Sequence, residues 1–143
     1  MFTHLHLHTQ YSLSQGAIRI KPLVTALQEQ GASACAITDH GNMSGVVEFH
    51  HALRGVGLKP ILGMGVYILE GSLEDARKTG GRPQGYPLQL LCENREGYHN
   101  LCYLASLSHT EGKLRGLPFL DRALLEQHRS GLIALSGGPQ GEV

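Results

Sequence analysis

Histidines and one aspartate with spacing suited to metal binding lie in two short stretches of the chain. His6 and His8 are separated by one residue, and Asp39 directly precedes His40. Side chains two residues apart on a strand point to the same face, so His6 and His8 could bind one ion together. Zinc and manganese both accept imidazole ligands, and a catalytic metal site keeps one position open for water. We therefore predict a divalent-metal site held by His6, His8 and His40.

An alternating pair of histidines has a simpler interpretation as the polar face of a half-exposed strand. His4 extends the alternation, and the leucines between the histidines fit the buried face of such a strand. The metal hypothesis gains weight because His40 follows a second apolar segment. Ligating imidazoles usually have an acceptor for their other N–H group, and we assign this orienting role in catalysis to Asp39. The remaining histidines are expected to be structural or solvated: His50, His51, His99, His109 and His128.

Strands and helices are expected to alternate along the chain. Alternating apolar residues and short apolar runs predict strands over 2–9, 34–38, 59–69, 88–92 and 132–135, whereas helical spacing predicts helices over 22–31, 46–57 and 95–109 and just after residue 121. This order favours an α/β fold with parallel strands, open or rolled into a barrel. Functional groups in such folds collect at the carboxyl ends of strands, where both histidine motifs lie.

The composition is that of a globular domain without an electrostatic preference for nucleic acid. The chain has 143 residues, of which 41% are hydrophobic and 17% charged, enough for a buried core. Its 12 basic and 12 acidic side chains cancel, whereas phosphate binding depends on Lys and Arg. We expect contact with DNA only through a larger assembly. Three scattered cysteines, and no signal region or membrane-length apolar run, indicate a cytoplasmic protein.

Several motifs together resemble one known family. The segments 4–9 (HLHLHT) and 36–41 (AITDHG) resemble the first two motifs of the polymerase and histidinol phosphatase (PHP) family. The resemblance continues through YSL at 11–13, GA at 16–17, GVVEF at 45–49, KPILG at 59–63, EGY at 96–98, NL at 100–101 and GLIALS at 131–136. The later segments are similar to the PHP domain at the N-terminus of the bacterial DNA polymerase III alpha subunit. Nearly the whole chain is covered, the range 70–87 excepted.

The resemblance implies both a fold and an activity. The fold is a distorted (β/α)7 barrel of parallel strands, of which 1–143 would be the N-terminal portion within a longer polymerase subunit. PHP enzymes hydrolyse phosphoesters with metal-activated water. In polymerases the domain is either a metal-dependent 3′–5′ exonuclease in proofreading or a structural platform that binds a separate proofreading exonuclease subunit. His6, His8 and His40 match ligand positions for zinc or manganese. The Gly- and Pro-rich range 70–87 is expected to be a flexible loop.

Three departures from the family pattern favour the platform over the enzyme. Gln15 stands where active-looking polymerase members tend to carry Asp, and Gly65 stands where a metal-bridging carboxylate is expected. The sequence ends at Val143, before the later histidine motifs of the family. We therefore expect a partly degenerate metal site, with open strand edges prone to self-association. A stand-alone phosphatase of the histidinol-phosphate type is a third alternative, disfavoured by the polymerase-like segments around Tyr98 and Leu132.

Overall fold

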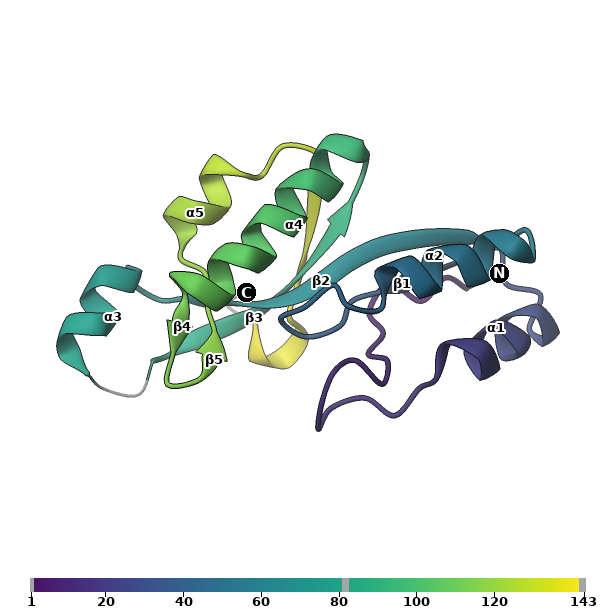
Figure 1. The fold of residues 1–143 in the computed structure, drawn as a ribbon, viewed down its shortest axis with the longest axis horizontal. Helices are drawn as coiled ribbons and strands as arrows, with labels where there is room; N and C mark the ends of the chain where they lie inside the picture. Colours follow the sequence, from purple (N-terminus) through teal and green to yellow (C-terminus); the bar gives the residue numbers. More distant parts are fainter. Residues whose placement is uncertain (1, 81–82, 142–143) are drawn as a thin grey trace.

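The computed structural model describes residues 2–80 and 83–141, in which helices pack beside an extended sheet (Figure 1). The long strand β2 runs along much of the length of the molecule. The elements are α1 (Ile20–Glu29), β1 (Ala34–Ile37), α2 (Val46–Gly55), β2 (Lys59–Leu69), α3 (Leu73–Thr79), β3 (Gly85–Cys92), α4 (Arg95–Thr110), β4 (Lys113–Leu114), β5 (Leu117–Pro118), α5 (Arg122–Gln127), β6 (Leu132–Ser136) and the 3₁₀ turn η1 (Gly138–Gln140).

The main sheet is mixed, which corrects the expectation of parallel strands. Its order is β1-β2-β3-β6, and only β1 and β2 are parallel, whereas β3 is antiparallel to both β2 and β6. The 7 residues of α3 extend about 10 Å, while the 11 residues of β2 extend about 36 Å. Since the connection is too short for a crossover, β3 returns alongside β2. The fold is α/β, and a complete barrel is not formed by the described residues.

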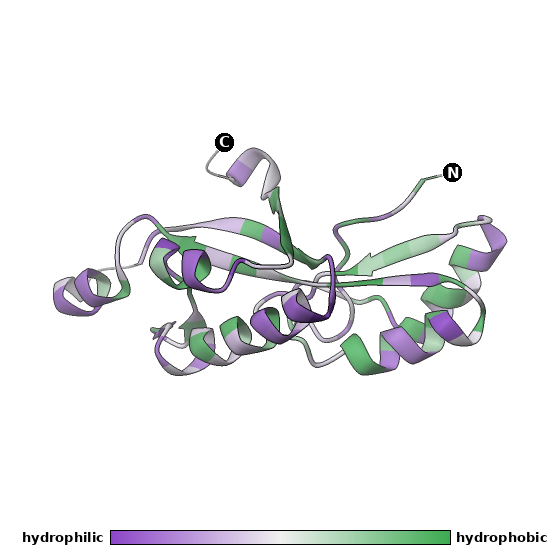
Figure 2. Cartoon of the chain, turned by 90° about the horizontal axis from the view of Figure 1, so that it is seen from above, coloured by the Kyte–Doolittle hydropathy of each residue, from purple (hydrophilic) through white to green (hydrophobic). Residues whose placement is uncertain are grey.

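Two apolar clusters hold the helices against the sheet. The first joins α1 and α2 to β1, with Leu27, Ile37 and Phe49 at its centre. The second joins α4 to β2 and β3, around Met64 and Leu101. Figure 2 shows α2 and α4 on the same side of the long strand. Buried residues recur at helical spacing on these helices, as the apolar pattern of the sequence predicts.

The expected first strand is replaced by an irregular extended segment beside β1. Ala36 donates its backbone N–H to His4 O, and Thr38 donates to Leu7 O. Between these two hydrogen bonds the edge segment advances three residues, from His4 to Leu7, while the partner advances only two, from Ala36 to Thr38. One extra residue in one of two paired segments is a β-bulge. The extra residue breaks the alternation, so Leu7 is buried while Leu5 is 39% exposed.

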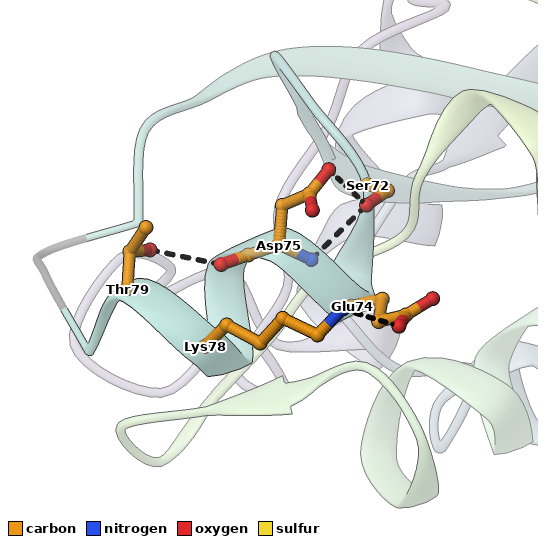
Figure 3. Close-up of polar contacts among 5 residues, drawn as sticks. All are labelled: Ser72, Glu74, Asp75, Lys78 and Thr79. Atoms are coloured by element: carbon orange, nitrogen blue, oxygen red, sulfur yellow. Dashed lines mark hydrogen bonds and ion pairs between the residues drawn. The ribbon is translucent and has the colours of Figure 1, made fainter.

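The range 70–87, expected to be a loop, contains the helix α3 and the start of β3. Ser72 caps this helix: its hydroxyl accepts the backbone N–H of Asp75 and donates to the Asp75 carboxylate. Figure 3 shows this cap together with the ion pair between Lys78 and Glu74. The short S-x-x-D signal thus stabilises a helix within a segment rich in Gly and Pro. Two residues of the expected loop, 81–82, lie outside the described ranges.

The cysteines are free thiols. Cys35 is fully buried in β1, and its burial raises the pKa of the thiol to about 11. Burial also raises the pKa of Cys92 to about 12. Both thiols are therefore held in the unreactive protonated form at neutral pH. Within the described ranges, no helix is both long enough and apolar enough to span a bilayer.

Candidate metal centre

The two histidines of the H-x-H motif point toward each other. The Nε2 atoms of His6 and His8 are 2.8 Å apart, and the ring centroids are separated by 4.9 Å. Two nitrogens bound to one tetrahedral zinc ion at about 2.0–2.1 Å lie roughly 3.3 Å apart. A small separation of the two rings would therefore let both nitrogens bind one ion.

A buried carboxylate lies behind this pair. Asp39 is 1% exposed, and its two oxygens accept hydrogen bonds from the Thr9 backbone N–H, the Thr9 hydroxyl and the Ser12 hydroxyl, each at 2.6 Å. A carboxylate this deeply buried is tolerated only when its oxygens are hydrogen-bonded. Asp39 therefore fixes the turn that follows the H-x-H motif.

Ser12 connects the carboxylate to a candidate ligand. Its single hydroxyl proton is donated to Asp39, while its oxygen accepts the backbone N–H of His40 at 3.0 Å. The Nδ1 atom of His8 lies 3.1 Å from the same oxygen. Because Ser12 has no second proton to give, His8 must donate from Nδ1. The lone pair of His8 is then on Nε2, where it accepts a hydrogen bond from His6 Nε2 in this structure and where a metal ion would bind instead.

The environment favours the neutral form of two candidate ligands. Burial lowers the pKa of His8, the charge of His6 lowers it further, and Asp39 opposes both effects. Burial, followed by the charge of His8, lowers the pKa of His40. A neutral imidazole is the form that binds metal ions, so both shifts favour binding near neutral pH.

His40 lies on the neighbouring part of the sheet. Beyond β1 the chain continues to pair with β2, since Gly65 donates its N–H to Asp39 O at 3.0 Å and Gly41 donates to Gly65 O at 2.7 Å. The His40 ring packs edge-on against Tyr67, with centroids 4.6 Å apart. In the described part of the chain, no group of three or more His, Cys, Asp or Glu residues is placed to hold a metal ion. The structure thus joins His6 to His8 and leaves His40 beside them.

Other site features were not found by reasoning from sequence. Ser12 and Thr9 become visible as partners of Asp39 only once the turn is folded. His109, expected to be structural or solvated, has its Nε2 atom 2.5 Å from Gly41 O and so fastens α4 to the loop that carries His40. An open pocket of about 450 Å³ lies between the H-x-H segment and α1, and Gln15 is among its lining residues.

Comparison with known proteins identifies the family. The model of the PHP domain matches residues 4–143. This chain belongs to the PHP family. The PHP domain is also 42% identical to the DNA polymerase III subunit alpha of Helicobacter pylori (strain ATCC 700392 / 26695) over 142 residues, which are 99% of this chain and 11% of that protein. The Campylobacter jejuni subunit is 44% identical over 142 residues, covering 99% of this chain and 12% of that protein.

A more distant relative agrees with this assignment of the PHP domain. The Mycobacterium tuberculosis (strain ATCC 25618 / H37Rv) DNA polymerase III subunit alpha is 36% identical over 154 residues, covering 99% of this chain and 13% of that protein. The chain therefore spans little more than a tenth of the length of these relatives.

Solved structures support the PHP-type fold. A protein from Bifidobacterium adolescentis, named as a metal-dependent phosphoesterase, superposes with a TM-score of 0.54 at 20% identity, covering 75% of this chain and 32% of that one. An amidohydrolase from Chromobacterium violaceum gives a TM-score of 0.55 at 18% identity, with 75% and 33% covered. At these identities the likeness concerns the fold alone, and about a third of each solved structure is matched.

Proposed function

We propose that this chain is the PHP domain of a bacterial replicative DNA polymerase of the DNA polymerase III alpha subunit type. We further propose that it acts in DNA replication mainly as a structural or partner-binding platform with a partly degenerate metal site. The observation that carries the platform role is Gly65, which lies beside His40 in the sheet and has no side chain to bridge metal ions.

The residues present fit one divalent ion better than a multi-metal centre. His6 and His8 supply converging Nε2 atoms, and His40 lies close enough for His8 to affect its pKa. These three imidazoles would hold zinc or manganese. A divalent ion in such a site supplies activation of water and neutralisation of phosphate charge. Asp39 would orient His8 through Ser12.

The partners that follow from this proposal belong to the replication machinery. They are the remainder of a polymerase subunit and a separate proofreading exonuclease subunit, with DNA reached only through that assembly. The balanced charge of the chain supports indirect contact with DNA, because 12 basic and 12 acidic side chains leave no net attraction for phosphate. Such a complex would work in the cytoplasm.

A metal-dependent phosphoesterase, acting as a 3′–5′ exonuclease in proofreading, is the second candidate. The hydrogen-bond chain from Asp39 through Ser12 to His8 favours it, because carboxylate support of a ligating histidine is typical of working metal sites. Gly65 and Gln15 count against it, since neither position supplies a carboxylate.

Hydrolysis distinguishes the two candidates. Purified protein is incubated with a 3′-labelled single-stranded oligonucleotide and with bis(p-nitrophenyl) phosphate, in Mn²⁺ or Zn²⁺, beside His8→Ala and the exposed control His51→Ala. The platform role predicts no metal-dependent hydrolysis by any of them. It also predicts that His8→Ala lowers thermal stability or binding of the proofreading subunit. Hydrolysis that is lost in His8→Ala and kept in His51→Ala would establish the enzyme instead.

A further inference from the structure

A row of three residues crosses the sheet beside the histidine pair. His40 pairs with Gly65, and Gly65 pairs in turn with Gln89 of β3. Side chains of directly paired residues project to the same face of a sheet. The His40 imidazole and the Gln89 amide therefore share one face, and between them Gly65 leaves a gap. His40 follows β1, and β2 lies between β1 and β3 in the sheet (Figure 1).

The Gln89 amide reaches into this gap. A Cβ atom built on Gly65 would lie 2.9 Å from Gln89 Oε1 and 3.5 Å from Nε2. The amide therefore lies directly against the position where a side chain of residue 65 would begin.

Gln89 Oε1 lacks a partner although the side chain is buried. The residue is 4% exposed, and Oε1 has no hydrogen bond to any described atom. Within the described ranges, it is the one buried side-chain nitrogen or oxygen left in this state. Buried acceptors without a donor are rare, because burial removes the hydrogen bonds they would make to water. The residues on the same face of β3, Pro87 and Leu91, are apolar and offer no side-chain donor.

An amide oxygen suits a cation. Side-chain carbonyl oxygens bind hard divalent ions, and manganese accepts both imidazole nitrogen and oxygen ligands. A leucine would fill the same space without leaving an unpaired acceptor, so packing alone does not explain a glutamine here.

We propose that Gln89 Oε1 is a ligand for a manganese-type divalent ion bound beside His40, in place of the carboxylate that Gly65 lacks. The inference rests on the proposed metal site and adds a ligand to it from β3. Gln89 is neutral, so the ion keeps more of its charge and is held less tightly than by a bridging carboxylate.

The test is titration of the whole metal-free chain with MnCl₂ by isothermal calorimetry. Gln89→Leu removes the oxygen at nearly constant volume, and Gln127→Leu makes the same change at an exposed position of α5 as a control. We expect Gln89→Leu to weaken Mn²⁺ binding about tenfold or more, by analogy with the loss of groups that support metal sites, and Gln127→Leu to leave it unchanged. Wild-type affinity in Gln89→Leu, or no Mn²⁺ binding by the wild type, would overturn the proposal.

Folding is followed separately by thermal melting. Without metal, Gln89→Leu should melt at or above the wild-type temperature, because an unpaired buried acceptor is removed. Its rise in melting temperature on adding Mn²⁺ should be smaller than that of the wild type. Should Gln89→Leu fail to fold, Gln89→Glu decides: it keeps the oxygen, adds charge and must bind Mn²⁺ at least as tightly as the wild type. Weaker binding by Gln89→Glu contradicts the ligand role.

The outcomes separate this inference from the platform function. Hydrolysis that depends on His8 would refute the platform whatever the Mn²⁺ affinity of Gln89→Leu. Unchanged Mn²⁺ affinity in Gln89→Leu, without hydrolysis by any variant, would refute only the ligand role of Gln89.

Discussion

The buried Asp39 carboxylate accepts a hydrogen bond from Ser12, which in turn contacts the candidate ligand His8. Its hydrogen bond from Ser12 uses the only hydroxyl proton of that serine, which in turn decides the tautomer of His8. A hydrogen bond to a charged group is worth about 1.5–3 kcal/mol, so the Ser12 hydroxyl is held strongly in the orientation that sets the His8 tautomer. The unprotonated Nε2 atom of His8 is thus a consequence of the Asp39 carboxylate, which acts through two hydrogen bonds.

Changing Ser12→Ala should release this constraint. We expect the His8 ring to populate both tautomers and metal affinity to fall about 10- to 100-fold, as for other groups that orient ligands. Imidazole ¹⁵N chemical shifts report the tautomer, and calorimetry reports the affinity. Ser12→Thr keeps the hydroxyl and should restore both, while the exposed Ser33→Ala should change neither. An unaltered tautomer in Ser12→Ala would show that Ser12 does not orient His8.

Two glycines on the same face of β2 should respond differently to an added methyl group. At Gly65 a Cβ meets the far end of the Gln89 side chain, which can move, and lies 3.4 Å from Thr38 O. At Gly63 a Cβ would lie 2.5 Å from the backbone oxygen of Leu90.

We therefore expect Gly65→Ala to lower the free energy of unfolding by about 1 kcal/mol. Gly63→Ala should lower it by at least about 3 kcal/mol, because the Leu90 backbone cannot move aside as a side chain can. Urea denaturation measures both losses. Equal losses would mean that the Gln89 amide is as fixed as the backbone. Gly65→Ala should also weaken Mn²⁺ binding, since it displaces that amide.

The sequence predicts the pairing of His6 with His8 but not their partners. Spacing along the chain is enough to bring two neighbouring side chains together. The hydrogen bond of Ser12 to Asp39 and the approach of Gln89 to Gly65 join residues distant in sequence, so no local pattern reveals them. The one local signal for Gln89 is a single polar residue within the apolar run of β3.

At the level of elements, the helices and the long strand are predictable because their apolar residues repeat at fixed periods. The direction of β3 is not predictable, because apolar and polar residues alternate in the same way in parallel and antiparallel strands. The bulge beside β1 also cannot be predicted from the sequence, since it depends on which backbone groups form hydrogen bonds. The helix α3 has a local signal in the cap formed by Ser72 and Asp75, which outweighs the Gly and Pro content of the surrounding segment.

The start of α4 lies in close contact with the turn before β6. A Cβ on Gly97 would overlap the backbone oxygen of Gly131, whereas a Cβ on Gly55, in α2, meets nothing within 4 Å. Gly97→Ala should therefore destabilise the fold by at least about 3 kcal/mol, because the clash is again with backbone, and Gly55→Ala should stabilise it by about 0.5–1 kcal/mol. The two free energies of unfolding are measured side by side. A stable Gly97→Ala variant would mean that this helix start can shift.

At the level of the whole molecule, the sheet ends in an open edge. Within the described residues, β6 pairs only with β3, and Ile133 on β6 is 46% exposed. Unpaired apolar edges promote association between chains. The described residues supply no further strand to cover this edge.

We therefore expect the isolated chain to self-associate as its concentration rises, as measured by sedimentation equilibrium. Ile133→Lys should reduce this association by placing a charge on the edge strand. Val47→Lys is the matched control, because Val47 is 59% exposed on α2, away from the edge. A chain that stays monomeric at all concentrations, or equal effects of the two variants, would argue against association through β6.

The metal content of untagged protein is the most direct test of the histidine site. Elemental analysis is carried out on wild type and on His8→Ala, with His51→Ala as the control. We predict close to one equivalent of zinc or manganese in the wild type and in His51→Ala, and its loss in His8→Ala. The absence of metal from the wild type, or equal metal in His8→Ala, would contradict a metal site held by His6, His8 and His40.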